Sequence, residues 1–334
     1  MKENKTILIT GVAGLLGSRL ADWLVENTNH NIVGVDDLSG GYIDNVHNQV
    51  QFHQFDLAES DRLEKLVKVT NPNVVYHLAA YAAEGLSPFM RSFNYKNNLM
   101  STSKVINACI NYEVDRLVFT STMAVYGHGN PPFDEEDTPT PIDPYGIAKY
   151  ACEMDIQVAG EQHGLDWCII RPHNVYGEKQ NIWDRYRNVL GIWMYQHMNN
   201  EKMTIFGDGE QKRAFSYMGD CLEPLYKAGF DKRASKEIIN LGSSKFYTIN
   251  QANEILIDVL KEGTPIYLEP RHEVKNAHPT WEKSMELLDY EDTTDLKTGL
   301  HNMWIWAQTQ PNRQRKSWEI YEVEKGIYDF WKNK

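Results

Sequence analysis

The chain has 334 residues, of which 42% are hydrophobic and 24% charged, and 34 basic against 46 acidic residues give it a formal net charge of −12. This length allows two domains or one large one, and the composition is that of a globular protein. The acidic surplus argues against binding to nucleic acid or to an anionic membrane surface, since both need basic patches.

The sequence shows no sign of secretion or of membrane insertion. None of its apolar runs approaches the roughly 20 residues that cross a bilayer, and the first segment, MKENKTILITG, lacks the apolar stretch of a signal peptide. The four cysteines, Cys109, Cys152, Cys168 and Cys221, are far apart, and no C-x-x-C or H-x-x-x-H pair occurs. We therefore expect a cytoplasmic protein with reduced thiols and no metal site.

The first half of the chain alternates short β-branched runs with amphipathic segments, which is typical of parallel strands joined by helical crossovers. We expect strands at Thr6–Thr10, Asn31–Val35, Val50–Phe55, Val74–Leu78, Arg116–Thr120 and Trp167–Ile170. Helices are expected at Leu15–Glu26, Asp61–Val69, Asn94–Asn111 and Pro144–His163. These elements predict an α/β fold with a Rossmann-like, doubly wound parallel sheet.

The pattern changes after residue 174. We predict a sheet domain over residues 1–174 and a smaller α/β domain over most of residues 175–334, with segments near 214–241 returning to the main sheet. Short strands are expected at Met203–Phe206 and Ala214–Tyr217, and Glu237–Leu241 is the strand that would rejoin the sheet. The last segment, Trp304 to Trp331, is rich in Trp, Tyr and charge, and we predict a surface-packed helical tail there.

Three glycines stand directly after the first strand and at the opening of the first helix. In TILITGVAGLLG, Gly11 permits a tight turn, Gly14 lets the backbone approach a pyrophosphate, and Gly17 allows close packing of helix on strand. The helix N-terminus then faces the phosphates with its free N–H groups. Asp36 ends the next strand roughly 20 residues after Gly17, where a carboxylate binds the ribose hydroxyls of adenosine. This context predicts a dinucleotide site rather than a plain turn between strand and helix.

The same aspartate favours NAD over NADP. A carboxylate repels a 2′-phosphate, and no arginine follows Asp36 in DDLSGGYID to bind one. Asp56, after the third strand, has two interpretations: it meets the adenine amino group, or it caps a helix over Ala58–Leu66.

A tyrosine and a lysine lie four residues apart in DPYGIAKY. On the predicted helix Tyr145 and Lys149 share a face, and a nearby ammonium lowers a tyrosine pKa so that the phenolate can take a proton from a substrate hydroxyl. The spacing Y-x-x-x-K occurs three times in the chain, so the pair alone is weak evidence. The preceding strand selects this pair, because it ends in VFTSTMAVYG and presents Ser121 and Thr122 at the sheet edge where ligands bind.

With these motifs the sequence resembles a known family, the extended short-chain dehydrogenases/reductases, and within it the NAD-dependent nucleotide-sugar epimerases and dehydratases of the UDP-glucose 4-epimerase type. The resemblance covers nearly the whole chain. It rests on TGVAGLLG (10–17), HLAA (77–80), TSTMAVYG (120–127), PYGIAK (144–149), RPHNVYG (171–177) and GDGEQKRAFSYMGD (207–220). It implies that NAD is the cofactor and that Thr122, Tyr145 and Lys149 are the catalytic residues.

The resemblance also implies two sets of binding residues. Asn98 would support Lys149 through water, and Pro172 would lie near the nicotinamide. The expected cofactor site consists of Gly11, Gly14, Leu15, Leu16, Gly17, Asp36, Asp37, Asp56, Leu57, Leu78, Ala79, Ala80, Asn98, Tyr145, Lys149 and Pro172. The expected substrate site consists of Glu84, Thr122, Tyr145, Asn174, Arg213 and Arg271.

Three of the substrate residues would hold the substrate diphosphate, for which arginine has the right geometry. Arg213 fits the family's G-x-x-R-x-F/Y pattern, and Arg271 fits less securely. Two of these residues have an alternative interpretation: Asn174 would then be a turn residue and Arg271 a surface charge, without contact to the diphosphate.

Two departures from the family pattern bear on the reaction. Members that remove water across C5 and C6 of the sugar carry an Asp-Glu pair directly after the active-site threonine, whereas this chain has Met123 and Ala124. The acid and base of that elimination are thus missing, and a 4,6-dehydratase is not expected.

Glu84 lies in a segment that varies with substrate, and no partner can be assigned to it. RPHNVYG followed by EKQNIW also resembles GDP-mannose 3,5-epimerases in part, without a clear match to their Cys/Lys pair.

The resemblance therefore implies an epimerase of a nucleotide-activated sugar, first of all a UDP-hexose inverted at C4 through a transient 4-keto intermediate. One alternative is a dehydrogenase acting at C4 that releases the keto product. Another is an epimerase acting at C2, C3 or C5 of a GDP-, TDP- or CDP-sugar. A fold that senses NAD without catalysis is a further alternative, against which the intact catalytic trio argues.

A homodimer is expected as well. In the family, the helices corresponding to Asn94–Asn111 and Pro144–His163 pair across a two-fold axis. The candidate contact stripes are Leu99, Val105, Ile106 and Cys109 on the first helix, and Ala148, Ala151, Cys152 and Asp155 on the second. The alternative is that both stripes pack on the protein's own sheet.

Overall fold

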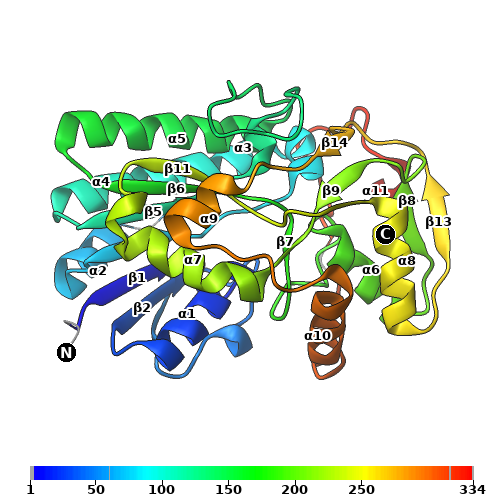
Figure 1. The fold of residues 1–334 in the computed structure, drawn as a ribbon, viewed down its shortest axis with the longest axis horizontal. Coiled ribbons are helices and arrows are strands. Elements are labelled where there is room, and N and C mark those ends of the chain that lie inside the picture. Colours follow the sequence, from blue (N-terminus) through cyan, green and yellow to red (C-terminus); the bar gives the residue numbers. More distant parts are fainter. Residues whose placement is uncertain (1–3, 60, 316, 333–334) are drawn as a thin grey trace.

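The centre of the molecule is a parallel sheet of seven strands in the order β11-β6-β5-β4-β1-β2-β3 (Figure 1). The computed structural model describes residues 4–332 apart from residues 60 and 316. The strands of the sheet are β1 (Thr6–Thr10), β2 (Asn31–Asp36), β3 (Gln51–Gln54), β4 (Val74–His77), β5 (Arg116–Thr120), β6 (Trp167–Pro172) and β11 (Glu237–Leu241). This arrangement confirms the Rossmann-like sheet, including the return of Glu237–Leu241 to its edge beside β6.

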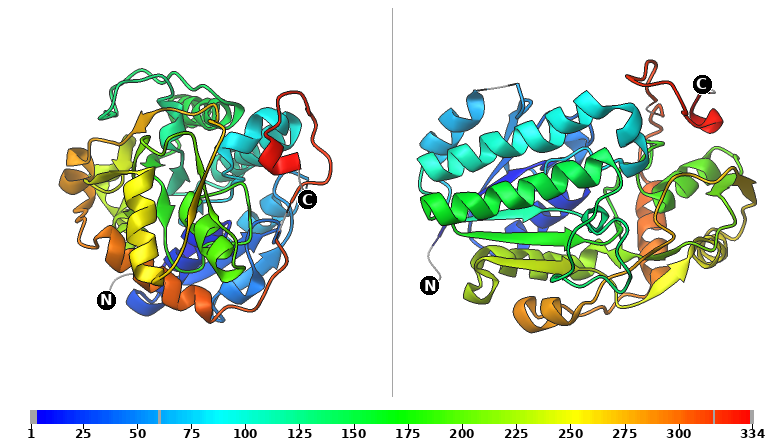
Figure 2. Two further views of the ribbon diagram at one scale, coloured as in Figure 1. Left: turned by 90° about the vertical axis from the view of Figure 1, so that its right-hand side faces the viewer. Right: turned by 90° about the horizontal axis from the view of Figure 1, so that it is seen from above.

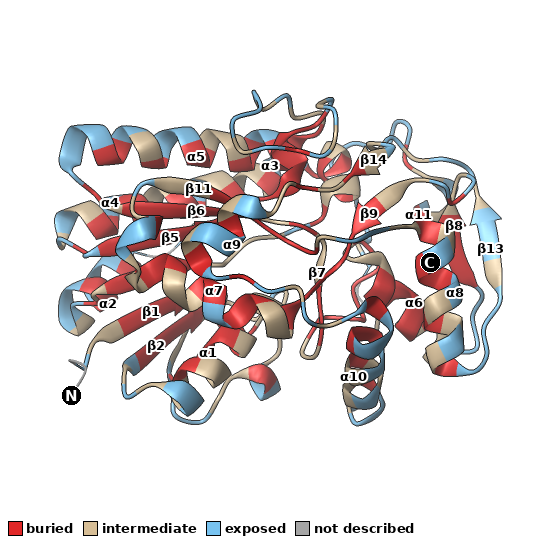
Figure 3. Cartoon of the chain, viewed as in Figure 1, coloured by how far each residue is buried: buried red, intermediate tan, exposed pale blue. Residues whose placement is uncertain are grey.

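Helices cover both faces of the sheet, which explains why its strands are continuous apolar runs (Figure 3). One face carries α1 (Leu15–Asn27), α7 (Met218–Phe230) and α9 (Glu282–Leu288). The other face carries α2 (Arg62–Thr70), α4 (Ser101–Asn111) and α5 (Pro144–His163). The carboxyl ends of the strands are left uncovered by these helices and point toward the smaller part of the molecule (Figure 1).

After β6 the chain forms a second hydrophobic core around Leu190, Trp193 and Leu256. The segments that form this core come partly before and partly after α7 and β11, which return to the main sheet. Its helices are α6 (Val189–Met198), α8 (Ile249–Leu260) and α10 (Leu296–Gln308). Its strands are β7 (Val175–Tyr176), β8 (Met203–Phe206), β9 (Lys212–Ala214), β10 (Ser216–Tyr217), β12 (Phe246–Thr248), β13 (Pro265–Leu268) and β14 (Asn276–Ala277). The single strand expected at Ala214–Tyr217 is thus divided, because β9 pairs with β12 and β14 whereas β10 pairs with β7.

The helix expected over Asn94–Asn111 is interrupted. It begins as α3 (Arg91–Tyr95), passes through a π-helical turn, η3 (Lys96–Met100), and continues as α4. Inside this turn, Asn98 is buried and its side-chain oxygen accepts a hydrogen bond from the backbone N–H of Tyr81 at 3.2 Å. The wider turn thereby ties the helix to the segment that follows β4. Four 3₁₀ turns complete the chain: η1 (Ile43–Asn45), η2 (Glu84–Phe89), η4 (Met123–Val125) and η5 (Lys232–Ala234).

The predicted helical tail is wrong for most of its length. Helix α10 ends at Gln308, and the described residues contain no further helix until the short α11 (Asp329–Lys332). The segment between them crosses from the smaller domain to α3 as an extended strap (Figure 2). Aromatic contacts hold it there: Trp318 packs on Phe93 with ring centres 4.6 Å apart, and Trp331 packs on Tyr186 at 5.1 Å. The aromatic residues that suggested a helix are thus used for packing on two separate surfaces.

In the part of the chain that the structure describes, no helix is both long enough and apolar enough to cross a membrane.

Candidate active site

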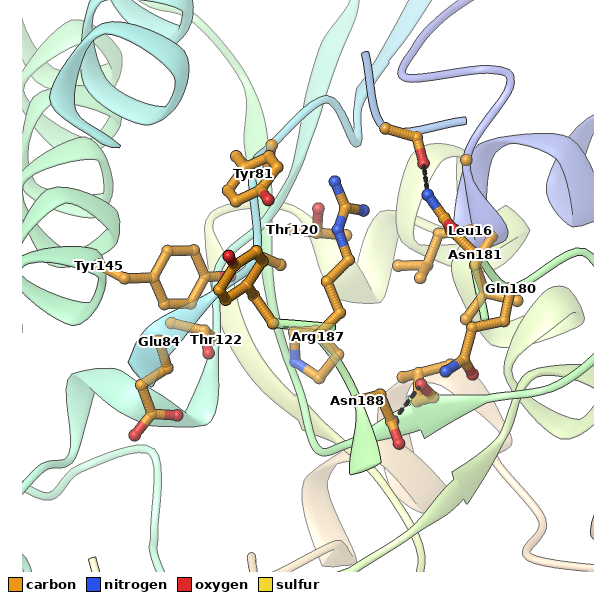
Figure 4. A pocket seen from close by; sticks show the side chains of 18 of the residues that line it. Leu16, Tyr81, Glu84, Thr120, Thr122, Tyr145, Gln180, Asn181, Arg187 and Asn188 are labelled. Atoms are coloured by element: carbon orange, nitrogen blue, oxygen red, sulfur yellow. Dashed lines mark hydrogen bonds between the residues drawn. The ribbon is translucent and has the colours of Figure 1, made fainter. Parts of the chain in front are cut away.

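A single large pocket runs along the carboxyl edge of the sheet and into the smaller domain (Figure 4). It brings together the glycine turn, the ends of β2 to β6, the first turn of α5, and strands and loops from residue 172 onward. The predicted residues that line it are Gly11, Gly14, Leu15, Leu16, Gly17, Asp36, Asp37, Asp56, Leu57, Leu78, Ala79, Ala80, Glu84, Thr122, Tyr145, Lys149, Pro172, Asn174, Arg213 and Arg271. Asn98 is the predicted residue that does not line it, since its side chain is used to bond Tyr81 and Asn94.

The glycine turn is shaped so that only glycine fits at two positions. Gly11 has a φ of +74°, and a Cβ there would lie 2.7 Å from the backbone nitrogen of Ala79. A Cβ on Gly17 would collide with the carbonyl oxygen of Gly11. Helix α1 begins at Leu15, so its unpaired N–H groups and the positive end of its dipole face the pocket. This cradle fits the pyrophosphate of a dinucleotide.

Asp36 connects the end of β2 to the glycine turn. Its carboxylate accepts hydrogen bonds from the backbone N–H groups of Ala13 at 3.0 Å and of Leu38 at 2.7 Å. Burial raises the pKa of Asp36, while these two hydrogen bonds oppose that rise. Each carboxylate oxygen still has a free lone pair for a ribose hydroxyl, which fits the adenosine end of the same dinucleotide.

Asp56 lines the pocket and also organises its own turn. Its Oδ1 accepts a hydrogen bond from the backbone N–H of Ala58 at 2.7 Å, and the ammonium of Lys96 lies 3.3 Å from its Oδ2. The helix that Asp56 was expected to cap begins only at Arg62, so the capping interpretation is wrong.

Helix α5 places Tyr145 and Lys149 in the pocket. The helix begins at Pro144, where Asp143 accepts a hydrogen bond from the backbone N–H of Gly146 at 2.9 Å as the N-cap. The Tyr145 side chain then lies beside Thr122, which stands directly after β5 (Figure 4). The Thr122 hydroxyl oxygen also accepts from the N–H of Ala124 at 3.1 Å, so its own proton is directed to other acceptors.

The electrostatics of this trio differ from the expectation. Burial raises the pKa of Tyr145, the neighbouring Thr122 hydroxyl opposes the rise, and Glu84 and Asp143 add to it. Burial also lowers the pKa of Lys149 to about 8. Lys149 follows Tyr145 by one helical turn, and its ammonium lies 4.2 Å from the centre of the Phe119 ring. The expected lowering of the Tyr145 pKa by Lys149 is therefore wrong for this structure, because desolvation outweighs it.

Near Tyr145 the pocket is lined by the Glu84 carboxyl group, and the buried carboxyl group of Asp143 lies behind it. Glu84, at the start of η2, stands on the same side of the pocket as Thr122 and Tyr145 (Figure 4). Burial and the nearby Asp143 raise the pKa of Glu84 to about 7, against the opposing effects of Arg213 and Arg271. Burial raises the pKa of Asp143 as well. Glu84 thus gains the partner that sequence reasoning did not find.

The smaller domain contributes cationic residues to the pocket. Arg213 on β9 donates to Glu273 at 2.9 Å and to the carbonyl oxygen of Val274 at 2.8 Å. Arg271 lies over the Phe206 ring at 4.1 Å, with its Nη2 3.8 Å from the same Glu273 carboxylate. Asn174 donates to the carbonyl oxygen of Ala214 at 3.0 Å. Two guanidinium groups and an amide therefore border the part of the pocket farthest from the glycine turn.

Sequence reasoning missed the segment around Tyr186 and Arg187. Figure 4 shows Arg187 projecting into the pocket between Tyr145 and Leu16. Its guanidinium pairs with Asp184 at 3.0 Å and lies 4.7 Å from the centre of the Tyr81 ring. The signal available was the crowding of charged and aromatic residues in NIWDRYRN, directly after RPHNVYG.

Within the described residues, no cluster of His, Cys, Asp and Glu gathers that could hold a metal ion.

The sequence profile of the NAD-dependent epimerase/dehydratase family matches residues 7–242. The chain belongs to this family. It is accordingly an NAD-dependent enzyme, and the glycine turn with Asp36 is the part of the pocket that fits NAD. The expected family and fold are both confirmed.

Three solved structures show how close the likeness is. The UDP-glucose 4-epimerase of Thermotoga maritima, solved with UDP-glucose, is 30% identical, with a TM-score of 0.85 over 91% of this chain and 98% of that one. The UDP-glucuronic acid 4-epimerase of Bacillus cereus, solved with UDP-glucuronic acid and NAD, is 29% identical, with a TM-score of 0.83 over 91% and 99%. The UDP-N-acetylglucosamine 4-epimerase of Methanobrevibacter ruminantium, solved with UDP-N-acetylmuramic acid, is 28% identical, with a TM-score of 0.85 over 92% and 100%. Such relatives are nucleotide-sugar epimerases, which are isomerases.

Proposed function

We propose that this enzyme inverts C4 of a UDP-hexose through a transient 4-keto sugar, with NAD held through the whole cycle. The observation that carries the proposal is that Tyr145 and Thr122 lie beside each other in the pocket at the sheet edge, with Lys149 one helical turn away (Figure 4). The relatives described above, which act on three different UDP-sugars at C4, support the same position. Met123 and Ala124 follow Thr122 and carry no acid or base, so removal of water is not favoured.

The residues divide the chemistry as follows. Tyr145 takes the proton of the C4 hydroxyl and later returns a proton to the C4 oxygen of the inverted sugar. Thr122 donates to the phenolate oxygen and so favours the ionised form of the base. Lys149 adds positive charge below it and would bind the nicotinamide ribose. When bound, NAD supplies the reversible oxidation of C4 and a positive charge next to the phenol.

The opposite end of the pocket would hold the rest of the substrate. Arg213, Arg271 and Asn174 would bind the diphosphate, because guanidinium groups match phosphate oxygens in pairs. Glu273 joins the two arginines and keeps both directed into the pocket. Pro172 lies at the end of β6, across from the catalytic helix, where the nicotinamide would lie.

Glu84 narrows the sugar class. A carboxylate at the sugar end of the pocket repels an anionic sugar and accepts hydrogen bonds from hydroxyl groups. The second carboxyl, Asp143, adds to the negative potential around Glu84. We therefore expect a neutral hexose to be preferred over a hexuronate.

The test is a panel of UDP-, GDP-, TDP- and CDP-sugars incubated with the purified protein without added cofactor, followed by proton NMR. Inversion at C4 of a UDP-hexose, with no build-up of a keto product, is the expected result. Inversion at another carbon would overturn the assignment of C4. Accumulation of a keto sugar that depends on added NAD would instead identify a dehydrogenase.

The working form would be a homodimer, and only part of the expected stripes is accessible to a partner. Val105, Ile106 and Cys109 on α4 and Ala148 and Cys152 on α5 are buried, whereas Leu99 and Ala151 are half-buried and Asp155 is exposed. A different apolar stripe is exposed on the outer side of these helices, and it consists of Met100, Ile147, Met154 and Val158. Helices α4 and α5 lie side by side (Figure 2), so the stripe forms a continuous surface for a second copy.

The four cysteines are free and buried, which suits a reducing compartment such as the cytoplasm.

A further inference from the structure

A second cavity lies on the far side of the segment that carries Arg187. It is an open cavity between the start of the carboxyl-terminal strap and the helix α6 region, and none of its described lining residues lines the active-site pocket. The side chains that matter there are Arg185, Tyr195, Glu201, Arg313, Arg315 and Phe330. We infer that this cavity is a binding site for an anion that carries phosphate groups.

The charge of the lining is the first argument. Three arginines border the cavity, against the single carboxylate of Glu201, in a chain whose net charge is −12. Glu201 is 3.3 Å from Nη1 of Arg315, and Asp44, outside the cavity lining, pairs with Arg313 at 2.6 Å, so positive charge remains in excess at the lining. A concentration of positive charge in an acidic protein attracts anions to this one place.

The unused donors are the second argument. Nε and Nη2 of Arg315 are buried and have no hydrogen-bond partner within the described part of the chain. Nε of Arg313 is likewise buried without a hydrogen-bond partner among the described residues, while Nη2 of Arg313 bonds Asp44 at 2.6 Å. A buried guanidinium donor without an acceptor is costly, and a phosphate oxygen would supply the acceptor.

The environment keeps these groups close together and dry. Burial lowers the pKa of Arg315, and the neighbouring Arg185 lowers it further. Aromatic rings fix the guanidinium planes: Arg315 lies 4.6 Å from the centre of the Tyr195 ring, and Arg185 lies 5.1 Å from that of Phe330. Guanidinium groups held in fixed planes pair well with the oxygens of a phosphate.

The site would be linked to catalysis through its position. Arg185 is followed by Tyr186, whose hydroxyl is 2.7 Å from that of Tyr321 and accepts a hydrogen bond from the backbone N–H of Trp318 at 3.1 Å. An anion bound between Arg185 and Arg315 would therefore fasten the strap to the segment that carries Arg187 into the active site.

Binding of inorganic pyrophosphate to the NAD-loaded protein, measured by calorimetry in saturating UDP, tests the inference. The UDP fills the site of the substrate diphosphate, so the heat reports a second site and does not depend on which sugar the enzyme uses. We expect one pyrophosphate per chain, and inorganic phosphate at higher concentration to compete. Arg315→Gln should weaken binding about tenfold or more, because it removes charge-assisted hydrogen bonds.

Two variants keep the test decisive. Arg233→Gln makes the same substitution away from the cavity, where Arg233 pairs with Asp231 and Asp289, and it should leave binding unchanged. Glu201→Gln removes the competing carboxylate and should tighten binding several-fold, an effect that a folding defect cannot produce. No binding in saturating UDP, or equal binding by wild type, Arg315→Gln and Glu201→Gln, would overturn the inference.

Discussion

The hydroxyl oxygen of Ser87 accepts a hydrogen bond from the backbone N–H of Tyr145 at 3.2 Å. The same hydroxyl lies 2.8 Å from the carbonyl oxygen of Glu84 and 3.3 Å from Oδ1 of Asp143. One serine thus joins the turn that carries the Glu84 carboxylate with the first turn of the helix that carries Tyr145. The residue that we propose selects the sugar and the residue that we propose as the base are held as one unit.

Tyr145→Phe removes only the phenolic oxygen, so it should abolish the base while leaving the pocket intact. We expect turnover to fall on the order of 10²–10⁴-fold, with NAD still bound. NMR of the substrate and analysis of the nucleotide released on denaturation measure the two effects. Tyr267→Phe, at an exposed tyrosine of the smaller domain, is the matched control. Near-normal turnover in Tyr145→Phe would show that another group is the base.

Asp36→Ala should narrow the preference for NAD over NADP, because a 2′-phosphate would no longer meet a carboxylate. The readout is the ratio of the two dissociation constants, measured on protein stripped of nucleotide. Asp37→Ala removes the same charge one residue along, where the side chain bonds Ser39 instead of the glycine turn. An equal change in both variants would mean that the ribose contact of Asp36 does not set the preference.

The pKa of Glu84 predicts a pH dependence of sugar selection. Because this pKa is raised from 4.5 to about 7, the group is neutral below that pH and negative above it. The repulsion of a hexuronate is therefore absent at pH 6 and present at pH 8. Inhibition by UDP-glucuronate, expressed relative to UDP-glucose, should weaken by about tenfold over this interval, the size of a like-charge interaction at a partly buried site.

Glu84→Gln is the control for this dependence. The other charged groups around Glu84 are Asp143, Arg213, Arg271 and Glu273, and all of them remain in the variant. The relative inhibition by UDP-glucuronate should then be independent of pH and as strong as in the wild type at pH 6. A profile that still changes in Glu84→Gln would assign the effect to one of those neighbours.

Local patterns in the sequence were enough to predict the sheet and the glycine turn, whereas much of the rest of the pocket was predicted from the family resemblance. The strands at Thr6–Thr10, Arg116–Thr120 and Glu237–Leu241 have the predicted bounds, because each is an apolar run buried on both faces. Glycine spacing located the cradle at Gly11 and Gly17 for an equally local reason, since the backbone there leaves no room for a Cβ.

What could not be predicted depends on contacts between segments far apart in the chain. Arg187 reaches the pocket only because the segment after β7 folds back over the sheet edge, and no spacing relates it to Asp36 or Tyr145. The pKa of Tyr145 depends on its burial, whereas the spacing to Lys149 suggested the opposite direction. The dimer stripes illustrate the same limit, because a helix that is apolar on two sides does not reveal which side faces its own sheet.

The exposed stripe of α5 supplies the last prediction. Ile147, Met154 and Val158 are between 43% and 46% exposed and recur on one face of the helix that carries Tyr145 on another. We expect light scattering at micromolar concentration to give twice the monomer mass of 38.6 kDa. Met154→Glu should shift the protein toward monomer, because two like charges would be buried across the two-fold axis. Val69→Glu, at an 83%-exposed apolar residue of α2, adds the same charge outside the stripe and should remain dimeric. If the second subunit stabilises the position of α5, activity should fall when the dimer dissociates. A fully active wild-type protein with the monomer mass of 38.6 kDa would rule out both the dimer and this stabilisation of α5.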